Sequence, residues 1–131
     1  MSNGYIKRII GPVVDVQFAE EEMPEIYDAL EMYAGERKIT AEVVQHIGGG
    51  RIRCIALSST DGLSRGTEVR STGGMLTMPV GEGTLGRMFN VTGDVIDGKG
   101  PLGELHREPI HRQAPPFTEV VPATAILETG I

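Results

Sequence analysis

Turn-forming residues recur about every ten positions through the first 80 residues, and this spacing constrains the fold more than any other feature. The turn signals are Gly11-Pro12, Gly48-Gly49-Gly50, 58–62, 64–66 and 71–74. Most segments between them are too short for stable helices and rich in residues that favour strands. We therefore expect about six short antiparallel strands in a sandwich or a barrel. A barrel is favoured because closure leaves no unpaired strand edge.

The expected strands follow from period-two alternation of apolar and polar residues. They cover 4–10, 14–18, 27–33, 37–47, 51–57, 67–70 and 75–80. In 14–18 the side chains of Val14, Val16 and Phe18 share one face, with Asp15 and Gln17 on the other. In the long strand the predicted buried face consists of Ile39, Ala41, Val43 and Ile47. Segment 27–33 could form a helix or a strand, and a strand is favoured because Pro24 and Gly35 leave little room for a helix.

Two glycine patterns resemble phosphate-binding loops. The first, Gly81-x-Gly83-x-x-Gly86, would need a helix directly after its third glycine, so that a pyrophosphate meets the helix N-terminus. Segment 87–91 is too short and too rich in strand formers for that helix, and Gly93 interrupts it. These glycines are therefore predicted to serve turns.

The second pattern is Gly93-x-x-x-x-Gly98-Lys99, in which Gly100 stands where a Ser or Thr would hold magnesium. Asp94 and Asp97 inside the pattern would repel a triphosphate. A hairpin explains the residues better: strand 86–91, turn Thr92-Gly93, strand 94–96 and a second turn at Asp97-Gly98.

The other residues of reactive or metal-binding types have structural explanations. Cys54 lies in an apolar strand and is predicted to be a small buried hydrophobe, and His46 is predicted to be a strand-end residue. The glutamates at 20–22 are predicted to lie in a solvated loop, and no histidine motif supports a hydrolase around the Ser and Asp of 58–61. His106 and His111 flank Pro109 at a spacing that does not fit a helical metal motif. No catalytic, cofactor-binding or metal-binding residue is predicted.

The composition limits the partners of the chain. The formal net charge of −6 is spread evenly, and the absence of Trp leaves few aromatic residues for base stacking, so nucleic acid is not expected as a partner. A single cysteine fits a reducing compartment. No stretch approaches the roughly 20 apolar residues that cross a bilayer, and no secretory signal or transit peptide begins the sequence, so direct membrane insertion is not expected.

The second half of the chain differs in character. Five prolines between positions 101 and 122 predict that much of 101–125 runs extended over other structure. We expect two parts: a barrel at 1–80, and at 81–131 the opening of a larger α/β nucleotide-binding domain cut at Ile131.

The stretch at 85–102, LGRMFNVTGDVIDGKGPL, resembles the segment in which the catalytic β subunit of F-type ATP synthases leaves its N-terminal barrel. Similar matches cover 9–16, 56–63, 106–117 and 126–131, in the family's order. The last of these stands shortly before the phosphate-binding loop in that family. Thr92 and Val95 depart from the usual aliphatic residue and proline. The α subunit shares a similar hairpin, but 59–62 and 106–117 favour β.

This resemblance implies a role for each part. The barrel would join neighbouring α subunits on both sides in a six-membered ring, within a peripheral complex on the cytoplasmic side of a bacterial plasma membrane. The full subunit would make or hydrolyse ATP with ADP, ATP and magnesium, coupled to proton transport, through residues beyond position 131. The chain alone is therefore expected to be inactive. Three alternatives remain: a free-standing small-barrel binding module, a small nucleotide-using enzyme, and the N-terminal piece of an α-type subunit.

Overall fold

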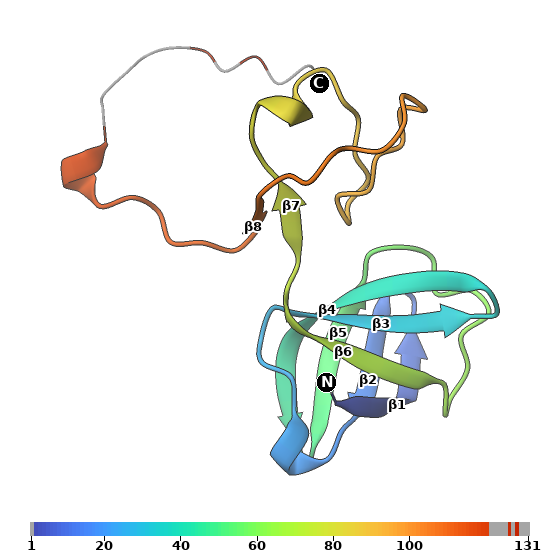
Figure 1. The fold of residues 1–131 in the computed structure, drawn as a ribbon. Helices are drawn as coiled ribbons and strands as arrows, with labels where there is room; N and C mark the ends of the chain where they lie inside the picture. Colours follow the sequence, from blue (N-terminus) through green and yellow to red (C-terminus); the bar gives the residue numbers. More distant parts are fainter. Residues whose placement is uncertain (1, 121–125, 127, 129–131) are drawn as a thin grey trace.

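Six strands form a closed antiparallel barrel in the N-terminal part of the chain (Figure 1). The structure is a computed structural model that describes residues 2–120, 126 and 128. The barrel strands are β1 (Asn3–Ile10), β2 (Val13–Gln17), β3 (Asp28–Ala34), β4 (Arg37–Gly48), β5 (Arg51–Ala56) and β6 (Glu68–Met75). Their order around the barrel is β1-β2-β5-β4-β3-β6, and β6 pairs with β1 to close it. The predicted mainly-β, six-stranded antiparallel barrel is confirmed, and segment 27–33 is strand as expected.

The alternation read from the sequence sets the barrel's inside and outside. Val14, Val16 and Phe18 are buried, and they meet inward-facing residues from every other strand. The largest fully buried side chains are Ile6, Leu30, Met32, Ile39, Ile52, Val14, Val16, Val43, Val69 and Cys54. Burial of this apolar surface is the main source of the barrel's stability.

Strand β4 departs from the predicted pattern at its end. Its pairing with β5 slips between Val43 and Gln45 and again between His46 and Gly48. Each slip places an extra residue on one strand and interrupts the alternation of side chains between the two faces. Ile39, Ala41 and Val43 are buried as predicted. Ile47 is only half-buried and lies outside the core cluster, so the prediction that it belongs to the buried face was wrong.

The triple glycine forms the predicted hairpin turn between β4 and β5. Gly48, Gly49 and Gly50 all adopt positive φ, which glycine reaches without steric cost. Gly50 is restricted further, because a Cβ there would lie 2.6 Å from the carbonyl oxygen of Phe18. The turn therefore packs directly on the end of β2, with Phe18 N donating to Gly50 O at 2.9 Å.

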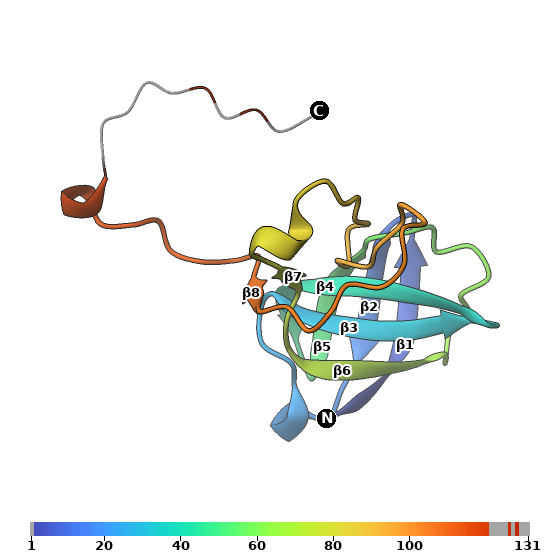
Figure 2. The ribbon, with the colours of Figure 1, turned by 45° about the horizontal axis from the view of Figure 1, so that its top comes forward.

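The chain leaves the barrel after β6 and begins a second, smaller sheet (Figures 1 and 2). The expected strand 75–80 is divided: Met75 ends β6, and β7 (Thr77–Pro79) pairs with β8 (Arg107–Pro109). Short 3-10 turns occur at η1 (Glu20–Glu22), η2 (Glu82–Thr84) and η3 (Phe117–Glu119). Most of 101–120 is irregular, as its prolines predict. The stretch at 126–131 lies largely outside the described residues, and the division at residue 80 stays a prediction.

Candidate functional site

The two glycine patterns lie in one looped region, between β7 and β8. In the first, η2 is a single 3-10 turn and no helix follows Gly86, as predicted. In the second, the expected hairpin is present in outline: Phe89 and Val95 form an antiparallel bridge, and Ile96 N donates to Met88 O at 2.9 Å. Regular strands do not form there. Neither pattern has the helix N-terminus that a phosphate-binding loop uses.

Asp97 organises the base of this hairpin. Its carboxylate accepts from Arg87 Nε at 2.6 Å and Nη2 at 3.1 Å, and from the backbone N–H groups of Lys99 and Met88. The Arg87 guanidinium and then the Lys99 amide hold the pKa of Asp97 well below its usual range. Lys99 Nζ donates to Gly86 O at 3.0 Å. The lysine of the second pattern therefore binds the hairpin's own backbone.

The tip of the hairpin is held by a second set of side chains. Asn90 Oδ1 accepts from the backbone N–H groups of Thr92 and Asp94, at 3.0 and 2.8 Å. Hydrogen bonds from Thr92 and Asn90 lower the pKa of Asp94. Gly93 has φ +79°, and a Cβ there would lie 2.8 Å from Arg107 Nη2 and 3.0 Å from Met78 Sδ. Gly93 therefore serves close packing of the tip against β7 and β8.

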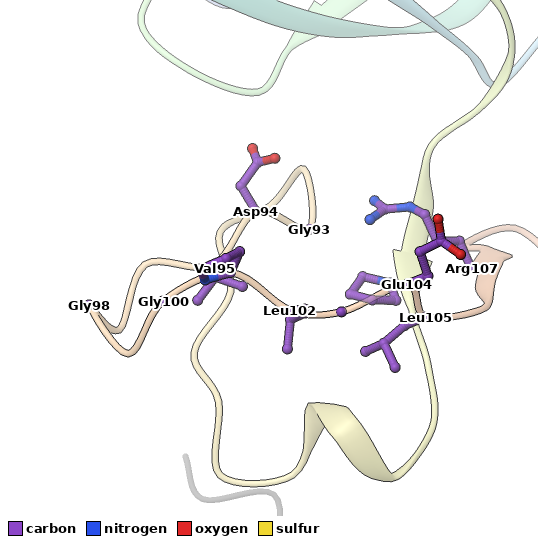
Figure 3. A pocket seen from close by; sticks show the side chains of 12 residues that line it. Gly93, Asp94, Val95, Gly98, Gly100, Leu102, Glu104, Leu105 and Arg107 are labelled. Atoms are coloured by element: carbon purple, nitrogen blue, oxygen red, sulfur yellow. The ribbon is translucent and has the colours of Figure 1, made fainter.

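An open hollow of about 780 Å³ lies beside this hairpin (Figure 3). Asp94 and Arg107 extend from opposite sides of the view, while Leu102 and Leu105 are directed toward η2. Arg107 is already engaged, because its Nη2 donates to the carbonyl oxygens of Thr77 and Thr92. With Asp94 and Glu104 also on the lining, the hollow offers no concentration of positive charge for phosphates.

The remaining sequence candidates have structural roles. Cys54 is fully buried, its Sγ donates to Val14 O at 3.0 Å, and burial raises the pKa of its thiol to about 12. His46 lies at the end of β4, with Nε2 2.8 Å from Pro24 O. Ser59 and Asp61 hydrogen-bond to each other in a turn. Over residues 2–120, 126 and 128, no three His, Cys, Asp or Glu side chains gather as a metal site.

The two histidines of the second half are not brought together. His106 pairs with Glu108 at 2.7 Å, whereas His111 reaches across to the barrel and contacts Glu42 of β4 at 2.9 Å. The His111 ring also stacks on Tyr27, with ring centroids 4.1 Å apart. Neither this contact nor the Arg87–Asp97 pair could be predicted from the sequence, because neither has a local sequence signal.

The outer surface of the barrel carries a cationic sector over β1, β2 and β5. Cross-strand register aligns Arg8, Asp15 and Arg53 in one row. Asp15 is nearly buried although it faces outward, because Arg53 covers it with hydrogen bonds of 2.8 and 3.1 Å. The Arg53 hydrogen bond lowers the pKa of Asp15, with Coulombic help from Arg8 and Arg51. Three arginines therefore face one aspartate, on a chain of net charge −6.

An apolar row lies beside these charges in the cationic sector. Ile10, Val13 and Ile55 are aligned across the same three strands, and the two isoleucines are 52% and 41% exposed. Exposed aliphatic side chains next to arginines are a combination that is favoured at protein interfaces.

The sector over β3 and β6 is electrostatically different. Glu31 is aligned with Arg70 across the strands and pairs with Lys38 at 3.0 Å, while Glu68 accepts from Asn3 at 2.6 Å. Strands β3 and β6 carry three acidic side chains, Asp28, Glu31 and Glu68, against one basic side chain, Arg70. The barrel thus has two unlike sides.

A comparison with known families matches residues 6–73 to the beta-barrel domain of the ATP synthase alpha/beta family. The match covers more than half of the 131 residues and nearly all of the β1–β6 barrel. The chain belongs to the ATP synthase alpha/beta family.

Membership in the ATP synthase alpha/beta family identifies the barrel as the N-terminal part of a rotary ATPase subunit. The family covers both α and β subunits, so the match does not separate them. Within the described part of the chain, no helix is long and apolar enough to cross a membrane.

Proposed function

We propose that this chain supplies the barrel of a catalytic β-type subunit of an F-type ATP synthase, and that the barrel joins α-type neighbours on both sides. The stretches 59–62 and 106–117 support the β type, because they resemble that subunit more than the α subunit. The observation that carries the assembly role is the pair of unlike outer sectors. A ring closed by head-to-tail contacts needs two different side surfaces on each member.

The charge of the two sectors favours unlike neighbours over self-association. The rest of this chain is strongly acidic, so two copies repel each other at long range, although salt screens this effect. The cationic sector, with its Ile10–Val13–Ile55 row, favours a partner that offers carboxylates around an apolar patch.

The catalytic chemistry of the proposed parent is assigned to residues outside this sequence. In an F-type β subunit it would use ATP or ADP with magnesium and be coupled to proton transport. The glycine patterns of this chain support no such role, because Lys99 and Asp97 bind the hairpin itself. The proposed location is a peripheral complex on the cytoplasmic side of a bacterial plasma membrane.

Sedimentation velocity tests the assembly role directly. The chain alone, an α-type barrel domain alone, and their mixture are compared at micromolar concentration. We expect the chain alone to be mainly monomeric and the mixture to form a heavier species. The double variant Arg8→Glu/Arg51→Glu should weaken this complex about tenfold or more, because it reverses the charge of the cationic sector. Arg65→Glu, in the exposed 58–67 loop, is the matched control and should bind normally.

Two results would contradict the proposal. A stable homohexamer of this chain with no affinity for the α-type barrel would exclude an alternating ring. Binding to a β-type barrel in preference to the α-type barrel would instead identify this chain as the α-type subunit.

A further inference from the structure

Tyr27 has an unusual backbone. Its φ is +75°, the only positive value among non-glycine residues of the described chain. An aromatic residue in this left-handed region is strained and persists only where its surroundings fix it. Part of that support comes from the barrel, because Tyr27 N donates to Val43 O at 2.8 Å. The turn before β3 adds more, since Asp28 N donates to Glu25 O and Asp28 Oδ2 accepts from Glu25 N.

The side chain of Tyr27 meets a residue more than 80 positions away. The ring of His111 lies over it at a centroid distance of 4.1 Å and an interplanar angle of 24°. His111 Nε2 also donates to Glu42 Oε2 at 2.9 Å; a carboxylate only accepts, so Nε2 is the protonated nitrogen. One residue earlier, Ile110 N donates to Leu76 O at 3.0 Å. The segment that follows β8 is therefore attached to the barrel through His111 from two directions.

The geometry points to a latch: we propose that Tyr27, Glu42 and His111 together fix the segment after β8 against the barrel wall, and that the left-handed backbone of Tyr27 sets whether the latch closes. Glu42 lies on β4 and Tyr27 directly precedes β3. Without the latch, 110–120 has few attachments: its described residues are mostly exposed, and η3 contains no buried residue. The latch is independent of which type of subunit this chain represents.

Removal of the histidine tests the latch. In His111→Ala, hydrogen exchange at the Ile110 amide should accelerate about tenfold or more, because both a stacked aromatic pair and a hydrogen bond to a charged group are lost. Exchange at the buried amides of β4 and β5 should stay unchanged. His106→Ala is the matched control, since His106 is the same residue type and its ring pairs with Glu108 of its own segment. In His106→Ala, the Ile110 amide should exchange at the same rate as in the parent chain.

A second variant separates the latch from ordinary barrel packing. Tyr27→Gly relieves the backbone strain and removes the ring but leaves the His111–Glu42 hydrogen bond, so Ile110 should exchange faster than in the parent chain and no faster than in His111→Ala, while the urea midpoint of the barrel does not fall. The double variant should exchange no faster than His111→Ala, because loss of His111 already removes the stacked pair.

Three outcomes would overturn the latch. Equal exchange at Ile110 in His111→Ala and His106→Ala would show that His111 attaches nothing. A lower urea midpoint in Tyr27→Gly with unchanged Ile110 exchange would make Tyr27 a packing residue of the barrel. Additive effects in the double variant would mean that Tyr27 and His111 act separately.

Discussion

The β1–β6 barrel buries a continuous cluster of apolar side chains, whereas residues 76–120 bury only Leu76 and Gly93. The second region is instead held by glycine turns and by charged or polar side chains that bind backbone groups, such as Asp97 and Asn90. Both regions satisfy their polar groups: within the described residues, no buried side-chain nitrogen or oxygen lacks a hydrogen-bond partner. The difference lies in the force that dominates, apolar burial in one and local hydrogen bonding in the other.

This difference has a consequence for cooperativity. Core contacts join all six strands, so the barrel should open as one unit. The hairpin at 86–100 depends on a few side chains near one another in sequence, so it should open alone.

Truncation of a core residue should affect the barrel most. Leu30→Ala removes a fully buried side chain and should lower the free energy of unfolding by about 2–5 kcal/mol, measured by urea titration. Reaction of the Cys54 thiol with a thiol reagent provides a second measurement, because Cys54 is buried and its pKa of about 12 leaves little thiolate at neutral pH. Met88→Ala, at an exposed hairpin position, should change the free energy by less than about 0.5 kcal/mol. Equal effects of the two variants would contradict the comparison.

Acid should open the hairpin before the barrel. The pKa of Asp97 is lowered in the folded hairpin, so its contribution is fully present above the ordinary aspartate pKa of about 3.9 and is lost as the pH falls through the lowered value. We expect the Ile96 amide, corrected for intrinsic exchange, to keep its protection at pH 5 and to lose it progressively below about pH 4.

Asp97→Asn removes the charge at all pH values. In this variant the Ile96 amide should lose its protection from hydrogen exchange already at pH 6. The amides of β4 and β5 should remain protected in both experiments, because apolar burial does not titrate and outweighs the stability that the barrel loses when Asp15, paired with Arg53, is protonated. Loss of protection in the barrel at the same pH as in the hairpin would show that the two regions open together.

Substitution of Lys99 should have the smallest effect. Lys99→Ala removes one hydrogen bond at the surface, from Nζ to Gly86 O, and should only slightly accelerate exchange around the hairpin base. We expect neither this variant nor the parent chain to hydrolyse ATP, and calorimetry with Mg-ATP should give no binding heat. Turnover above a matched blank that disappears in Lys99→Ala would show that the second glycine pattern is a phosphate-binding loop after all.

Local chemistry explains why so much of the barrel could be predicted. Alternation at Val14, Val16 and Phe18 and the triple glycine after β4 each depend on residues adjacent in sequence. The buried roles of Cys54 and the strand-end position of His46 follow from the same patterns. The stretches that resemble the ATP synthase β subunit also led to the correct family.

Contacts between distant segments could not be predicted in this way. The slips in β4 that leave Ile47 half-exposed depend on the register with β5, and the pairing of β7 with β8 joins segments about 30 residues apart. The arginines around Asp15 come from β1 and β5, and their outward rows are aligned with Asp15 by the pairing of both strands with β2.

The amino-acid sequence by itself determined most of the barrel strands and their turns, because periodicity and turn chemistry act over a few residues, and its resemblance to a known family identified the family. Only the tertiary structure decided which side chains meet: Arg87 with Asp97, Arg53 with Asp15, and His111 with Tyr27 and Glu42. The contacts of Asp15 and His111 form when segments far apart in sequence are brought together, whereas Arg87 meets Asp97 only once the hairpin at 86–100 has closed. The unlike sides of the barrel and the latch after β8 both depend on the tertiary structure.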